Sequence, residues 1–531
     1  MEKARFPDWV FTLVALVVAF AAALFLRVVP PFSSVFAGPD IRLTGIDAYF
    51  YMRLVDNLVH NFPLLMRFDP YGSYPAGFDL SNVPAFYAYL TAAAVKLLGG
   101  SNPSQQTVDT IAVYIPAILG ALTVIPAFFL ARALANRWAG LFAALLLALM
   151  PGEFLGRSLL GNTDHHVAET LFTSFFIMFF VLAIQHGRQF TYAMLRKGQW
   201  PPASRHVPYA LFAGIFLGFY LITWQGALMF VFIIFVYFFI QFVSDHLRSF
   251  PTDYLSKIAI ITFLVAMLIF LPFSRDKTTL LCLAAVVLIP IALNAVSSVI
   301  AARDIRPAYY LLAVAGLVLA GGLLAWALFP AIISFVLGYL GTIFGWRTLQ
   351  MYVGEMKPLF FPGGFFTLEV AWSEYALALY TGLAGLAALL YLCVRKGRPE
   401  HILTAVCSIV LMLASFSMVR FSAYFAVCLA VLTGFLGGWL VDMAAPVKDL
   451  AAQEGLSKKA KKATRGKSPP GGKRVTALLV ASLMTAVVLA PGAAVAVNAA
   501  GNPAHVPPDG WMEALAWLKK NTPEPFGRAD Y

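Results

Sequence analysis

The chain has 531 residues, of which 60% are hydrophobic and only 12% are charged, whereas about 25% of the residues in soluble proteins are charged. Apolar runs of about 20 residues, long enough to cross a bilayer as a helix, recur along most of the chain. This composition excludes an ordinary soluble enzyme, a disordered chain, collagen and a transmembrane barrel. The formal net charge of +12 owes much to a polybasic segment, residues 458–474, so we expect membrane lipid and no nucleic acid as a partner.

Apolar windows bounded by charge, proline or glycine predict about thirteen membrane-spanning helices. They lie near residues 9–30, 111–134, 138–152, 167–187, 207–222, 226–244, 256–273, 278–300, 308–329, 374–394, 402–418, 421–442 and 475–499. The first run is too long for a signal-peptide core and lacks a small-residue cleavage site, so we expect it to remain as a span. The four cysteines lie inside apolar runs without metal-site spacing and are expected to pack in the core.

The distribution of basic residues predicts the orientation of the chain. Lys and Arg concentrate in alternate loops, including 188–205, 395–398 and 448–474. The positive-inside rule places these loops and the N-terminus in the cytoplasm, and an odd number of spans places the C-terminus outside. Two loops on the outer side, residues 31–110 and 330–373, are longer than a connection requires. We therefore predict an all-α, multi-pass protein of the cell membrane with two long extracytoplasmic loops.

Acidic residues and histidines gather in the predicted outer loops. Asp47, in the segment GIDAYFYMR, either caps the helix that follows or takes part in a site. Asp164 and His166, in GNTDHHVAE, lie two positions apart, so extended backbone would let both bind one divalent cation. Adjacent histidines also occur as interfacial polar residues. We favour a metal site because ionisable groups at a membrane boundary cost free energy and are therefore typical of functional positions.

Two further charged residues fall on the same predicted side. Glu355, in VGEMKP, is by itself compatible with a plain surface position. Arg420 lies between two apolar runs and requires an anion, either a phosphate group or an acid from the long loops. Together these residues predict one extracytoplasmic metal site beside an anion-binding group. The absence of Walker, HExxH and GxSxG motifs disfavours ATP hydrolysis, zinc proteolysis and triad hydrolysis.

Five segments in chain order resemble the catalytic subunit of oligosaccharyltransferase, and within it the single-subunit archaeal form, dolichyl-phosphooligosaccharide protein glycotransferase. The segments are GIDAYFYMR, RSLLGNTDHH, YVGEMKP, VRFSAY and GWMEALAWLKKNTPEPFG. The resemblance implies inverting transfer of an oligosaccharide from a polyprenyl (dolichyl) phosphate or pyrophosphate carrier to the asparagine of Asn-x-Ser/Thr sequons. It also implies Mn²⁺ or Mg²⁺ as cofactor, a lipid-linked donor and an acceptor polypeptide as partners, and action as a single subunit.

The resemblance assigns roles position by position. The implied site comprises Asp47 and Glu355 as catalytic residues, Asp47, Asp164 and His166 as metal ligands, Arg420 as the ligand of the lipid pyrophosphate, and Arg157 and His165 as supporting residues. One departure is that Glu355 follows Tyr352-Val353-Gly354 where the family has a Thr-Ile-x-Glu motif, which puts in doubt the backbone contact to the third position of the acceptor sequon.

The end of the chain marks a second departure. The family's Trp-Trp-Asp-Tyr-Gly segment, which reads the acceptor Ser or Thr, is not in this sequence. The resemblance therefore implies a transmembrane domain over residues 1–500 and, at 501–531, the start of an extracytoplasmic soluble domain, as in a longer protein truncated at Tyr531. Two alternatives stay open, another polyprenyl-phosphate-dependent membrane glycosyltransferase and a transporter. The transporter is disfavoured because the spans carry few charges near their midpoints and show no two-fold repeat.

Overall fold

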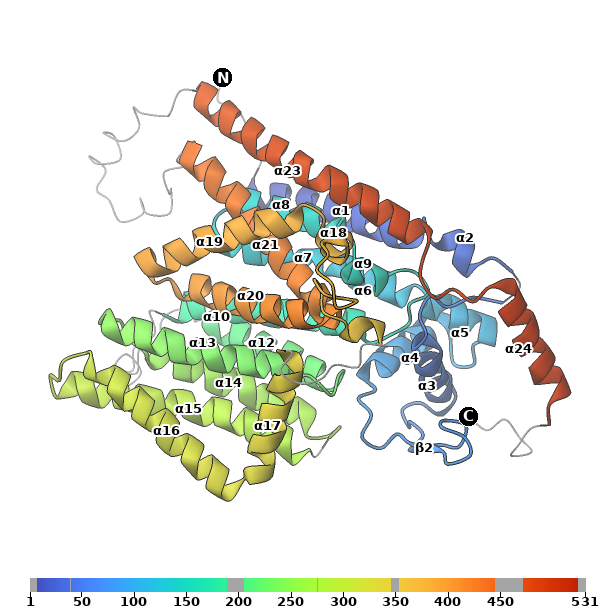
Figure 1. Cartoon of the computed structure of the whole chain (residues 1–531), viewed down its shortest axis with the longest axis horizontal. Coiled ribbons are helices and arrows are strands. Elements are labelled where there is room, and N and C mark those ends of the chain that lie inside the picture. The colour runs from blue at the N-terminus through green and yellow to red at the C-terminus, as the bar shows by residue number, and fades with distance from the viewer. Residues whose placement is uncertain are drawn as a thin grey trace.

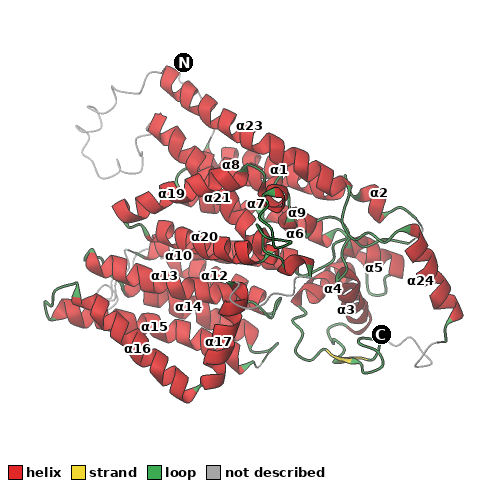
Figure 2. Cartoon of the chain, in the orientation of Figure 1, coloured by secondary structure: helices red, strands yellow, loops and turns green. Residues whose placement is uncertain are grey.

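The computed structural model describes residues 7–38, 40–188, 205–274, 276–344, 353–444 and 471–523, and these residues are almost entirely helical (Figure 2). The long helices lie side by side with their axes in roughly one direction, and shorter helices gather at one end of them (Figure 1). Most of the polybasic segment predicted at 458–474 lies outside the described residues.

The first part of the chain forms helices α1 to α10. Their bounds are α1 (Asp8–Val28), α2 (Phe32–Val35), α3 (Ala48–Asn61), α4 (Phe86–Gly99), α5 (Gln105–Ala112), α6 (Ile115–Leu122), α7 (Val124–Leu134), α8 (Arg137–Ala148), α9 (Glu153–Gly156) and α10 (His166–Gly187). Between α3 and α4, the short strands β1 (Phe68–Asp69) and β2 (Phe78–Asp79) pair antiparallel. The first predicted long loop, 31–110, is therefore largely structured.

The second part of the chain continues the bundle. Its elements are α12 (His206–Leu221), α13 (Leu228–Leu247), α14 (Asp253–Phe270), α15 (Lys277–Ala302), α16 (Tyr309–Leu328), α17 (Pro330–Ile343), η1 (Gly354–Met356), α18 (Glu369–Tyr375), α19 (Ala378–Lys396), α20 (Pro399–Ser417), η2 (Val419–Phe421), α21 (Ser422–Ala444), α23 (Gly471–Gly501) and α24 (Asp509–Asn521). The second predicted loop, 330–373, thus begins with an apolar helix, because proline is compatible with the first helical turn and apolar residues follow it.

Every span predicted from the sequence coincides with a helix. In the described part of the chain, ten helices are long and apolar enough to cross a membrane. The other predicted spans coincide with α8 and α12, which have 12 and 16 residues, and with α23, whose segment Ala486–Gly501 is a shorter apolar helix. The architecture is that of a multi-pass membrane protein, and the count of thirteen spans remains a prediction.

Small residues permit the closest helix contacts, as is common in membrane bundles. A Cβ atom added at Gly434 of α21 would lie 2.5 Å from the carbonyl oxygen of Ala139 in α8, and one added at Gly385 of α19 would lie 2.3 Å from that of Leu432. At the edge of the bundle, α16 leaves Leu312 and Leu319 68% and 66% exposed. Such a surface fits lipid, which solvates apolar side chains as well as a protein core does.

The close contact between α8 and α21 predicts that even one added methyl group at Gly434 will destabilise the protein. Gly434→Ala is expected to lower the free energy of unfolding by about 1–3 kcal/mol, as overpacking typically does, and thermal unfolding in detergent micelles measures it. Gly322→Ala in α16 is the matched control, because no atom lies within 4 Å of the added Cβ. Equal stability of both variants would contradict this account of the packing.

Candidate metal and anion-binding site

Hydrogen bonds join the segment before α3 to the segment before α10. The Thr44 amide donates to the Gly161 carbonyl oxygen at 3.1 Å, and the Thr163 hydroxyl donates to the Ala48 carbonyl oxygen at 3.2 Å. The two contacts flank Asp47 in the first segment and are near Asp164 in the second. Two acids that are far apart in the sequence are thereby held at the same end of the bundle.

Asp47 occupies the position that precedes α3, yet its side chain makes no capping hydrogen bond. Partial burial and the negative charges of Asp164 and Glu355 raise the pKa of Asp47, while His165 and Arg157 oppose the rise. The structure therefore does not show the capping role. It places Asp47 within electrostatic reach of the other predicted site residues.

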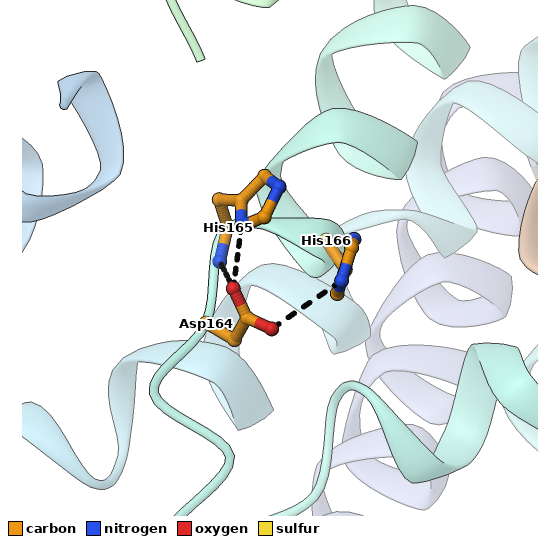
Figure 3. Close-up of side chains that lie close together, drawn as sticks. All are labelled: Asp164, His165 and His166. Carbon is orange, nitrogen blue, oxygen red and sulfur yellow. Dashed lines mark hydrogen bonds and ion pairs between the residues drawn. The ribbon is translucent and has the colours of Figure 1, made fainter. Parts of the chain in front are cut away.

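Asp164, His165 and His166 form a compact group at the start of α10 (Figure 3). One ligand atom from each residue can be chosen so that all lie within 4.8 Å of one another. The His166 Nε2 atom lies 3.4 Å from Asp164 Oδ2, close to the separation of about 3 Å for adjacent ligands of a cation with 2.1 Å bonds in octahedral geometry. One carboxylate and one or two imidazoles suit a divalent ion.

Both imidazoles contact Asp164 and Glu169, but His165 lies closer to Asp164 than His166 does. His165 Nδ1 lies 2.5 Å from Asp164 Oδ1 and its Nε2 lies 3.0 Å from Glu169 Oε1. Burial alone would lower the pKa of His165, but the charges of Asp164 and Glu169 raise it. These contacts favour the protonated form of His165, in which neither nitrogen can bind a metal. They therefore favour the supporting role for His165 and the ligand role for His166.

Glu169 was not among the predicted site residues, although it contacts both histidines. Its Oε1 atom also lies 2.9 Å from His166 Nδ1, and its Oε2 atom accepts a hydrogen bond from the Tyr424 hydroxyl. A carboxylate bonded to the second nitrogen of a metal-binding histidine fixes its tautomer and orientation. The available signal was spacing, because Glu169 follows the histidines by three and four residues on a helix.

Glu355 lies between two arginines. Its Oε2 atom accepts from Arg157 Nη2 at 2.7 Å, and its Oε1 atom accepts from Arg420 Nη1 at 2.6 Å. Burial opposes ionisation of Glu355, but the charges of Arg420 and Arg157 outweigh it and lower the pKa of this carboxyl group. Glu355 is therefore a carboxylate at neutral pH rather than a plain surface residue. Arg420 thus pairs with an acid of the second long loop, and its binding of a phosphate group stays a prediction.

Backbone contacts hold this charge cluster in place. The Val419 amide donates to the Lys357 carbonyl oxygen at 2.9 Å, and the Leu359 amide donates to that of Phe416 at 3.2 Å. These bonds fasten the chain after η1 to the connection between α20 and α21. Arg420, in η2, also lies with its guanidinium 4.9 Å from the ring centre of Trp224. The sequence analysis did not identify Trp224.

The predicted site residues thus form two adjoining parts. Asp164, His165 and His166 form one part with Glu169, and Glu355, Arg157 and Arg420 form the other. Asp47 is linked to both through its interactions with Asp164 and Glu355. Among the described residues the compact group of three comprises Asp164, His165 and His166, and the role of Asp47 as a metal ligand stays a prediction.

The family profile of Oligosaccharyl transferase STT3, N-terminal, matches residues 16–458. The chain belongs to this family. It is 27% identical over 535 residues to the dolichyl-phosphooligosaccharide-protein glycotransferase 3 of Archaeoglobus fulgidus, a match that covers 96% of this chain and 58% of the relative. The chain therefore spans about three-fifths of that relative's length.

Solved structures of the oligosaccharyltransferase AglB from Archaeoglobus fulgidus share the fold. The complex with an inhibitory peptide and a dolichol-phosphate has a TM-score of 0.83 at 26% identity, covering 98% of this chain and 59% of that one. A form tethered to an acceptor peptide with the NVT sequon has a TM-score of 0.79 at 26% identity, over 98% and 58%. A complex with Zn and sulfate has a TM-score of 0.69 at 25% identity, over 96% and 56%.

Removal of one imidazole tests the metal site. His166→Ala is expected to weaken Mn²⁺ binding by more than the roughly 10- to 100-fold that loss of an outer hydrogen-bond partner costs, as measured by an electron paramagnetic resonance titration of the purified protein. His186→Ala is the matched control, because His186 lies on the same helix and is exposed. Unchanged affinity in the His166 variant would remove this residue from the ligand set.

Proposed function

We propose that this protein is an oligosaccharyltransferase that moves an oligosaccharide from a dolichyl phosphate or pyrophosphate carrier to the asparagine amide of Asn-x-Ser/Thr sequons. The observation that carries the proposal is the joining of Asp164–His166 and Arg157–Glu355–Arg420 at one end of the bundle. Family membership and the dolichol-phosphate and NVT-peptide complexes of the archaeal structures support it.

The acceptor nitrogen is the chemical difficulty in this reaction. Its lone pair is delocalised into the carbonyl group, the same conjugation that sets a barrier of roughly 18–20 kcal/mol to peptide rotation. In the proposed mechanism the carboxylates of Asp47 and Glu355 each accept a hydrogen bond from one of the two amide N–H groups. These hydrogen bonds polarise or twist the amide. The carboxylate of Glu355 has about four lone-pair sites, so its bonds to two arginines leave sites for the acceptor.

The leaving group is a lipid phosphate or pyrophosphate. Arg420 has five N–H donors, so its bond to Glu355 leaves donors for an anionic oxygen. Asp47, Asp164 and His166 would hold Mn²⁺ or Mg²⁺, with His165, Arg157 and Glu169 supporting them, and the bound ion would offset negative charge that develops on the leaving group. Attack opposite the leaving group inverts the anomeric carbon, and the residues contribute position and electrostatics without a covalent intermediate.

The proposal includes a location in the cell membrane. The alternation of basic loops supports a cytoplasmic N-terminus and an extracytoplasmic site. At the site end of the bundle, Arg42 of the first loop contacts Asp509 of α24 at 2.5 Å. This contact supports the proposal that residues 501–531 begin an extracytoplasmic domain attached to the membrane domain 1–500. The protein would act as a single subunit.

Neutralisation of the two acids tests the mechanism. Asp47→Asn and Glu355→Gln are each expected to slow glycan transfer to an Asn-x-Thr peptide roughly 100- to 1,000-fold, the range for loss of one preorganised electrostatic group. Transfer is measured with the purified protein and a dolichyl-linked oligosaccharide. The exposed acids Asp304 and Glu513 provide control variants, Asp304→Asn and Glu513→Gln, which should retain the rate. Full activity of the Asp47 variant would refute its catalytic role.

Metal dependence has a separate test. Treatment with EDTA is expected to abolish transfer, and addition of Mn²⁺ or Mg²⁺ is expected to restore it. The reason is that the cation held by the carboxylate and imidazole groups would balance the negative charge of the leaving group. The anomeric configuration of the product, determined by nuclear magnetic resonance, reports inversion. Transfer that persists after complete chelation would contradict the metal mechanism, and modification of Ser or Thr in place of Asn would favour another polyprenyl-phosphate-dependent glycosyltransferase.

A further inference from the structure

A buried carboxyl group on α18 contacts the turn that leads into α9. Glu374 is only 7% exposed, and its Oε2 atom accepts a hydrogen bond from the Glu153 amide at 2.9 Å. Gly152 adopts a positive φ of 74°, and a Cβ atom there would lie 2.5 Å from Glu374 Oε2. The turn therefore needs glycine, both for its conformation and for the close approach of Glu374.

The Glu153 side chain continues this contact toward the candidate site. Its Oε2 atom pairs with Arg157 Nε, one turn further along the chain. Arg157 uses its other arm, Nη2, to bind Glu355 at 2.7 Å. An arginine bonded at two points of its guanidinium group has a defined plane and direction. Glu374 is thus connected to Glu355 through Glu153 and Arg157.

We propose that Glu374 is a positioning residue for the transfer reaction that holds the Gly152–Glu153 turn in place, so that Glu153 directs Arg157 toward Glu355. This inference rests on the proposed function. It assigns a task to a buried carboxyl group directly after the second long loop, in a segment whose sequence shows no motif.

The charge environment of Glu374 favours the neutral form. Burial and the negative charge of Glu153 raise the pKa of Glu374 to about 8, although the hydrogen bond from the Glu153 amide and the charge of Arg157 oppose the rise. These two residues provide the charges that act on it. The helices α19 and α21 also pack on α18, but their charged residues are at their far ends, at Arg395, Lys396 and Asp442.

The sign of the pH effect follows from these charges. Below pH 8 Glu374 is protonated, and its contact with the turn carries no repulsion. As the pH rises through 8 the group ionises. The bond from the Glu153 amide favours the ionised form, but the new charge repels the Glu153 carboxylate in a site of low polarity, which disturbs the contact of Glu153 with Arg157. Transfer should therefore fall between pH 7 and pH 9.

The experiment compares Glu374→Gln, Glu374→Ala and wild type over that pH range, with Glu369→Gln as the matched control because Glu369 is exposed on the same helix. The Gln variant should be a few-fold slower at pH 7 and lose the alkaline fall, since its side chain is neutral at every pH. The Ala variant should lower kcat about tenfold with little change in KM. The control should keep the wild-type rate and profile.

A second variant separates positioning from general loss of structure. Glu153→Gln should reproduce the kcat loss of Glu374→Ala, and the double variant should lose little more, because the two residues act through the same arginine. Mn²⁺ affinity and thermal unfolding should stay near wild type in all of them. An alkaline fall that persists in Glu374→Gln, or additive losses in the double variant, would overturn the proposal. Failure of the wild type to transfer glycan would instead overturn the proposed function.

Discussion

A carboxylate held between two guanidinium groups determines how the polar end of this helix bundle is organised. Glu355 contacts Arg157, which is 198 residues away in the sequence, and Arg420, which is 65 residues away. All three side chains are largely withdrawn from water. Loss of one partner from such a buried arrangement leaves an uncompensated charge, which typically costs 3–5 kcal/mol. The elements that carry these residues, α9, η1 and η2, are therefore held together electrostatically.

The same end of the bundle also contains a second group of charges. Glu169 contacts His165 and His166, and Asp164 contacts both imidazoles on the other side. The two groups adjoin each other, and charges from both act on the pKa of Asp47. A set of carboxylates with few lysines suits a divalent ion, whereas paired arginines suit phosphate oxygens. The arrangement thus places groups suited to a cation beside groups suited to an anion, in keeping with the proposed transfer from a lipid phosphate.

Comparison of the sequence with the structure separates local from long-range information. Each predicted span became a helix because a run of about 20 apolar residues has no other stable form in lipid. The motifs identified the acids and arginines, but not their partners. Glu153 and Trp224 were missed since nothing in their immediate sequence distinguishes a residue that supports a site from one that packs in a bundle. Glu169 was not assigned a role, although its helical spacing from the histidines was a signal. The helix α17 was missed because an apolar segment beside another span was assigned to a loop.

The sequence by itself determined the membrane-embedded helical class, the approximate positions of the spans and the identity of the candidate residues, because hydropathy and short motifs are local properties. Only the tertiary structure decided that Arg420 pairs with Glu355, that His165 contacts two carboxylates, and that Glu374 contacts the turn before α9. These pairings depend on which loops the packed helices bring together. That choice depends on interhelical contacts such as Gly434 against Ala139, whose partners are hundreds of residues apart and have no signature in either segment alone.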